Sequence, residues 1–96
     1  MEEIEIGTEP VNPLTHVKPY FSSMSDSEIS ILIGSIIFFK DVKLKLLQEL
    51  LNMKRLEVEE QIGRLLQSNL VQGQFTSDTF LLTSVNYNIE KQRPHL

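Results

Sequence analysis

The chain has 96 residues, no cysteine, and 13 acidic against 9 basic residues, which give a formal net charge of −4. A chain of this length supports one small domain, and without cysteine it can hold neither a disulfide framework nor a thiolate zinc site. Because the net charge is negative, the average electrostatic field of the chain disfavours binding to nucleic acid or to an anionic membrane. The most apolar uncharged run, residues 29–39, is about half as long as a membrane-spanning helix. We therefore expect a soluble, cytoplasmic domain with no membrane segment.

Residues 1–24 are predicted to form an extended N-terminal arm. Pro10, Pro13 and Pro19 interrupt the segment, and its apolar residues follow no sustained period. Those apolar residues are nevertheless more numerous than a pure linker needs, so part of the arm is expected to pack on the domain or on a partner. They are Ile4, Ile6, Val11, Leu14, Val17, Tyr20 and Phe21.

A first helix is predicted to begin at about Asp26. Ser25 and Glu28 have the spacing of a capping box, in which the side chain of each residue accepts a hydrogen bond from the backbone N–H of the other. The core stripe consists of Ile29, Leu32, Ile33, Ile36 and Ile37.

Further apolar residues lie partly off this stripe, namely Ile31, Phe38 and Phe39. We expect them to be covered by the arm, by the C-terminal tail or by a second copy of the chain, so a homodimer through this helix or the arm is possible. Gly34 lies in the middle of the helix, where glycine costs about 1 kcal/mol relative to alanine. Close packing of another element against Gly34 is the expected explanation.

A short strand, two helices and a hairpin are predicted to follow. Residues 42–44 alternate like a strand, and a leucine-rich helix then ends near Asn52. The next helix turns Val58, Ile62, Leu65 and Leu66 toward the core and ends at Asn69, a residue that tolerates left-handed backbone. Two β-prone runs, 70–75 and 80–84, are separated by the polar turn 76–79.

This order of elements predicts an α+β fold, a small winged helix with three helices and a C-terminal β-hairpin wing. The expected boundaries are an arm at 1–24, a domain at 25–84 and a C-terminal tail at 85–96. Residues 42–71 resemble, without a gap, the strand, helix, turn and helix shared by many winged helices; Gly73 and the second strand match as well.

Within that superfamily the stretch is most similar to the winged helix that closes PCI domains, and to the DDRGK-domain proteins. PCI domains are scaffold modules of the proteasome lid, the signalosome and a translation initiation complex. The resemblance implies a domain that binds other proteins, although residues 74–79 lack the DDRGK signature and no helical-repeat region precedes the domain.

Candidate partner-binding residues lie on the helix after the turn and on the wing. If the four apolar residues of that helix point inward, the polar residues between them point outward, where a DNA-reading helix would meet the major groove. The candidates are Glu57, Glu60, Gln61, Arg64, Ser68 and Asp78. Their acids repel phosphates. An alternative nucleic-acid patch consists of Lys40, Lys43, Lys45, Lys54 and Arg55.

No catalytic site is expected. His16 and His95 lie in the two terminal segments, and the adjacent Glu59 and Glu60 diverge by about 100° around a helix axis. No metal, cofactor or nucleotide motif occurs. The sequence therefore favours a non-catalytic interaction module that acts as a subunit or adaptor of a larger assembly. The alternative is a small dimeric winged-helix transcription regulator that binds DNA.

Overall fold

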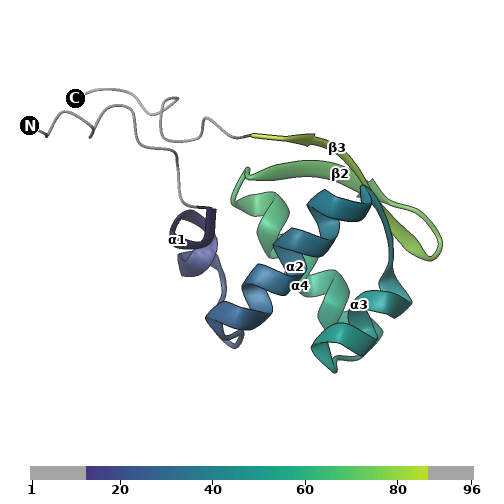
Figure 1. The fold of residues 1–96 in the computed structure, drawn as a ribbon, viewed down its shortest axis with the longest axis horizontal. Helices are drawn as coiled ribbons and strands as arrows, with labels where there is room; N and C mark the ends of the chain where they lie inside the picture. Colours follow the sequence, from purple (N-terminus) through teal and green to yellow (C-terminus); the bar gives the residue numbers. More distant parts are fainter. Residues whose placement is uncertain (1–12, 87–96) are drawn as a thin grey trace, which may run out of the picture.

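A computed structural model describes residues 13–86. The predictions for Ile4, Ile6 and Val11 of the arm, and for the tail from residue 87 on, lie outside the described residues. The described residues form four α-helices, one 3-10 helix and three strands. They follow in the order α1 (Pro13–Val17), η2 (Lys18–Tyr20), α2 (Asp26–Phe39), β1 (Asp41–Lys43), α3 (Leu44–Leu51), α4 (Arg55–Gln67), β2 (Val71–Phe75) and β3 (Thr79–Val85). In Figure 1, α2 crosses in front of α4, and the strands lie along one side of the helices.

The predicted start of α2 and the predicted ends of α3 and α4 agree with the structure. At the start of α2, Ser25 N donates to Glu28 Oε1 at 2.8 Å and Glu28 N donates to Ser25 Oγ at 3.2 Å, which confirms the capping box. Positive φ angles stop the helices at Lys40 (65°), Asn52 (55°) and Asn69 (67°). The left-handed conformation predicted at Asn69 is thus confirmed.

The three strands form one antiparallel sheet in the order β1-β3-β2. The predicted hairpin is confirmed, and Thr76 N donates to Thr79 O at 2.9 Å across its turn. The first strand lies one residue earlier than predicted. Leu44 already begins α3, and its N–H donates to Asp78 O at 2.9 Å. This bond ties the start of α3 to the hairpin.

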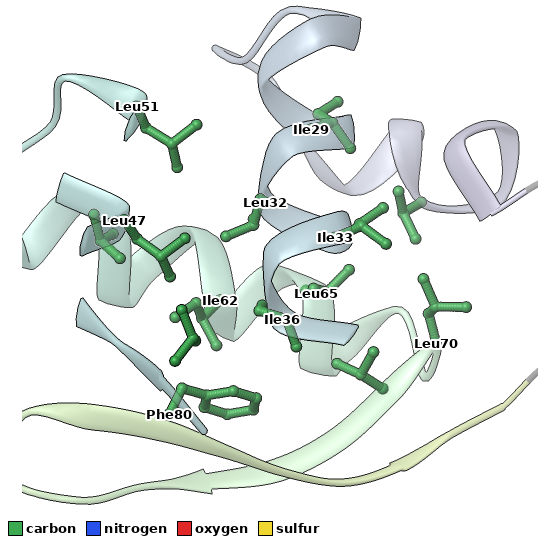
Figure 2. Close-up of a cluster of buried hydrophobic side chains, with 14 of the residues drawn as sticks. Ile29, Leu32, Ile33, Ile36, Leu47, Leu51, Ile62, Leu65, Leu70 and Phe80 are labelled. Carbon is green, nitrogen blue, oxygen red and sulfur yellow. The ribbon is translucent and has the colours of Figure 1, made fainter. Parts of the chain in front are cut away.

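Phe80 fixes the distance between the sheet and the helices. Its side chain is fully buried, and Figure 2 shows it between the strands and the side chains of Ile36 and Ile62. Gly73 lies beside it on β2. A Cβ at Gly73 would come within 2.3 Å of Leu81 O and 2.6 Å of the Phe80 ring, so only glycine fits there.

The prediction of an extended arm is wrong for residues 13–20, which are helical. Val17 is completely buried and Phe21 nearly so, and both belong to the hydrophobic core. Val17 ends α1 and Phe21 directly follows η2, and the burial of both side chains favours this folded segment; Pro19 lies in the first turn of η2, where its missing N–H is tolerated. The expectation that part of the arm packs on the domain is confirmed.

The predicted role of Gly34 is also wrong. A Cβ built on Gly34 has no heavy atom within 4 Å, so no described element packs against it. Ile31, Phe38 and Phe39 remain 39%, 78% and 47% exposed, so residues 13–86 cover Ile31 and Phe39 only in part and leave most of Phe38 open. The core stripe itself is confirmed, with Ile37 only partly buried at its margin.

The described residues form an α+β domain whose helices are followed by a C-terminal antiparallel hairpin, a topology consistent with a winged helix. The structure adds α1 and η2 to the three predicted helices. No helix within 13–86 is both long enough and apolar enough to cross a membrane.

The core residues of α4 give the first testable prediction. Ile62 and Leu65 are both fully buried, so replacing either by alanine should lower the free energy of unfolding by about 2–5 kcal/mol. Leu56→Ala is the matched control, because Leu56 lies on the same helix but is 78% exposed; it should cost less than about 0.5 kcal/mol. Urea denaturation measures all three. Equal losses at Leu56 and Leu65 would contradict the orientation of α4.

Candidate functional site

Helix α4 occupies the position of the DNA-reading helix in a winged helix-turn-helix, between the turn and the hairpin. Its inward face is as predicted. Val58, Ile62 and Leu65 are fully buried, and Leu66 is partly buried against the same core. The opposite side of α4 is therefore the surface on which a candidate site is to be sought.

The six residues predicted to face outward do not share one environment. Glu57, Glu60 and Asp78 are exposed, and Arg64 is half-buried. The prediction is wrong for the other two: Gln61 is 5% exposed and Ser68 is 2% exposed. Ser68 lies next to residues 14–21, which reach it through His16, and Gln61 is buried beside the core residues Val58, Ile62 and Leu65 of its own helix.

We call residues 14–21 the N-terminal cover. Two polar contacts hold it to α4 and to the residue that follows α4. His16 Nε2 lies 2.8 Å from Ser68 O, and because a carbonyl oxygen can only accept, Nε2 carries the hydrogen. Arg64 Nη1 donates to Tyr20 O at 3.0 Å. The cover therefore combines buried apolar side chains with two side-chain donors aimed at main-chain oxygens.

The side chain of Ser68 is satisfied within its own turn. Its Oγ donates to Leu65 O at 2.6 Å and accepts from Leu70 N at 3.3 Å. Ser68 thus stabilises the exit from α4 and is not available as an outward contact. A serine near a helix end commonly does this, because its hydroxyl competes well for unpaired backbone groups.

Gln61 is buried without complete pairing. Its Oε1 has no hydrogen-bond partner among the described residues. A buried unpaired acceptor of this kind costs about 1–3 kcal/mol. The burial of the neighbouring apolar side chains Val58, Ile62 and Leu65 offsets this penalty.

The N-terminal half of α4 remains open to solvent, and its charged groups are largely paired with one another. Lys54 N donates to Glu57 Oε1 at 2.9 Å, and Arg55 Nε pairs with Glu59 at 2.9 Å. Arg64 pairs with Glu60 at 3.0 Å. Three glutamates against two arginines leave α4 with a net charge of −1. This open half presents acids where phosphate would approach.

The alternative basic patch is only partly assembled. All five of its residues are exposed. Arg55 Nη2 donates to Ser77 O in the wing turn, and Lys43 is the register partner of Thr79 at the end of that turn. Lys40 lies at the other end of β1, where its carbonyl accepts from Leu82 N at 2.7 Å. Of the five residues, Lys43 and Arg55 therefore lie at the wing turn, and Lys40 lies at the opposite end of β1.

No group of three or more potential metal-ligating side chains occurs within residues 13–86. His16, which the sequence assigned to an arm, is part of the fold through its contact with Ser68. Sequence analysis missed His16 and Tyr20 as contributors to this surface. The available signal was the four-residue spacing of Val17 and Phe21, which is typical of one helical face.

The contact between His16 and Ser68 can be tested by mutation. His16→Ala removes the donor to Ser68 O, and we expect a loss of about 1 kcal/mol in unfolding free energy. Amide hydrogen exchange should also accelerate across the N-terminal cover. Ser22→Ala, at an exposed position just beyond the cover, is the control and should change neither quantity. Unchanged exchange in His16→Ala would show that the contact does not hold the cover.

No family model matches the chain, and no match was found among the curated proteins or the solved structures. The fold assignment therefore rests on the order of the elements and on the antiparallel sheet described above.

Proposed function

We propose that this chain is a non-catalytic protein-interaction module of winged-helix type that acts as a subunit or adaptor of a larger assembly. One observation carries the proposal. One side of the helix that reads DNA in a winged helix-turn-helix is held by residues of the same chain, at Arg64 and at Ser68, the residue that follows the helix. These contacts narrow the surface that α4 could offer to a DNA groove, so the arrangement favours another use of the fold.

The charge of the uncovered half supports the same proposal. Glu57 and Glu60 are exposed there, and Asp78 is exposed in the wing turn. DNA binding draws most of its affinity from lysine and arginine contacts to phosphate, and carboxylates at those positions oppose it. Protein surfaces carry both signs of charge, and acidic residues are compatible with a protein partner.

The absence of a catalytic role is part of the proposal. The imidazole of His16 is engaged with a main-chain carbonyl, and the carboxylates of α4 pair with arginines or with the helix start. No nucleophile and base stand together in these contacts. We propose no cofactor. The cytoplasmic location remains a prediction.

The resemblance to PCI-type and DDRGK-type winged helices is the finer part of the proposal. Its support is the order of β1, α3, α4, β2 and β3 over residues 41–85, which is the order of those domains. Under this proposal the partner is a protein, and the assembly has several subunits.

Affinity capture tests the proposal. The full chain, tagged at its C-terminus, is incubated with nuclease-treated lysate of the source organism, and retained proteins are identified by their peptides. The expected result is a stoichiometric set of subunits that survives 0.3 M salt. An Ile62→Ala variant, with its core disrupted, serves as the control for nonspecific retention. Retention of the same proteins by both would count against a specific interaction.

A dimeric DNA-binding regulator is the second candidate. The observation that favours it is the meeting of Lys43 and Arg55 at the wing turn, because basic residues at the wing are typical of contact with the DNA backbone. Arg55 is already paired with Glu59, and Asp78 lies in the same turn. These acids offset the basic groups locally.

Binding to DNA separates the two candidates. We expect no affinity tighter than about 10 μM at roughly 0.1 M salt, because specific regulators bind at about 10 nM or below and depend on phosphate contacts. Genomic fragments from the source organism should be used, so that a true operator is present. Electrophoretic mobility shift at several salt concentrations gives the measurement.

The triple variant Glu57→Gln, Glu60→Gln, Asp78→Asn is measured beside the natural chain. If only the triple variant binds DNA, those carboxylates keep a DNA-shaped fold from DNA, as proposed. Nanomolar and sequence-selective binding by the natural chain would instead establish the regulator and overturn the interaction module.

A further inference from the structure

The outer face of α2 carries no charge, and its large side chains are apolar; Ser30 and Gly34 are the small residues between them. Ile31 is 39% exposed and Phe38 is 78% exposed, and both lie on the same side of the helix as Gly34. No charged residue occurs between Glu28 and Lys40. In Figure 1, α2 is the front helix, with α4 behind it. A solvent-facing helix side usually carries charges, so this face is unusual for a free surface.

Gly34 lies at the middle of this face. No contact within the described residues explains why a glycine, which lowers helix stability, occupies this position. Glycine in a helix interior is about 1 kcal/mol less favourable than alanine, and no atom approaches the position of its missing Cβ. Missing side chains at helix contacts allow two backbones to come close. The bare backbone at Gly34 is thus suited to an element from outside the domain.

We propose that the occupant of this face is a second copy of the chain, with the two α2 helices packed antiparallel about a two-fold axis at Gly34. The face is complementary to itself in this arrangement. Phe38 follows Gly34 by four residues and Ser30 precedes it by four, so the large ring of each copy meets the small serine of the other. Ile31 meets Ile37 in the same way. The proposal rests on the interaction function above and names one of its partners.

The charges at the helix ends favour the same orientation. Asp26 and Glu28 lie in the first turn of α2, and Lys40 follows its last turn. Antiparallel packing brings the acidic start of each helix toward the lysine of the other copy and sets the two helix dipoles in opposite directions. A parallel arrangement would place like charges together. Asp26 already lies 3.2 Å from Lys18 in an exposed pair, so these charges set direction more than affinity.

The size of the face limits the strength of the dimer. A helix of 14 residues is about 21 Å long and about 10 Å wide, so two such faces bury on the order of 400 Å². Stable interfaces bury about 1,200–2,000 Å². We therefore expect a reversible dimer with a dissociation constant of roughly 10–500 μM, in the range of weak and transient contacts.

Sedimentation equilibrium of the full chain from about 5 μM to 1 mM tests the proposal across that range. The mass of the natural chain should rise from 11.1 kDa toward that of a dimer. Phe38→Ser should weaken association at least tenfold. Leu56→Ser is the matched control, because Leu56 is also 78% exposed but belongs to α4, and it should leave the dissociation constant unchanged.

Gly34→Gln provides a second, independent readout. In dilute solution its melting temperature should be higher than that of the natural chain, because glutamine is a better helix former and the position is open. Its dimer should nevertheless be at least tenfold weaker, because the side chain separates the two backbones. A merely structural role of Gly34 would not move these two quantities in opposite directions.

Three outcomes would overturn the proposal. A mass that stays at 11.1 kDa throughout is the first, and association that is equally strong in Phe38→Ser and Leu56→Ser is the second. The third is a monomer whose lysate partner is lost in Phe38→Ser; the interaction module would then stand, with a different chain on α2. Conversely, sequence-selective DNA binding by a dimer that Phe38→Ser disrupts would remove the interaction module and retain the α2 dimer.

Discussion

The arrangement of the domain depends on the space that Phe80 fills between the sheet and the helices. The ring is fully buried, and β2 can pass beside it only because residue 73 has no side chain. Val42 and Phe75 are register partners of Phe80 on the two flanking strands, so one ring sets the position of all three. Since the start of α3 is bonded to the wing turn, the same ring also fixes where α3 and α4 meet the sheet.

Much of the fold could be predicted because its signals are local. The capping box at Ser25 and the left-handed Asn69 each depend on a few neighbouring residues, and the hairpin depends on two β-prone runs with a polar turn between them. The candidate site could be predicted only in part, because Ser68 was expected to face solvent from helical periodicity, yet it is buried and contacts His16, which lies 52 residues away in sequence. Periodicity orients a helix toward its core but cannot show what covers its other side.

The two broad faces of the helical layer differ in chemistry. The outer side of α4 is polar, is partly covered by its own chain and is acidic where it is open. The outer side of α2 is apolar and open, with Gly34 bare at its middle. A winged helix that reads DNA has the reverse requirement, a free basic surface on the helix before the wing. Because the outer side of α4 is polar and that of α2 is largely apolar, we expect the contact surface on α2 and not on α4.

The two hydrogen bonds of the N-terminal cover end on main-chain oxygens, at Ser68 and Tyr20. Every residue has a main-chain carbonyl oxygen, so substitutions at Ser68 or Tyr20 keep both acceptors. A substitution at His16 or Arg64 removes a donor and with it one hydrogen bond. Of the four positions in these two bonds, the two acceptor positions therefore tolerate a change of side chain. For these two bonds the required side chains are His16 and Arg64, one on each of the surfaces that the bonds join.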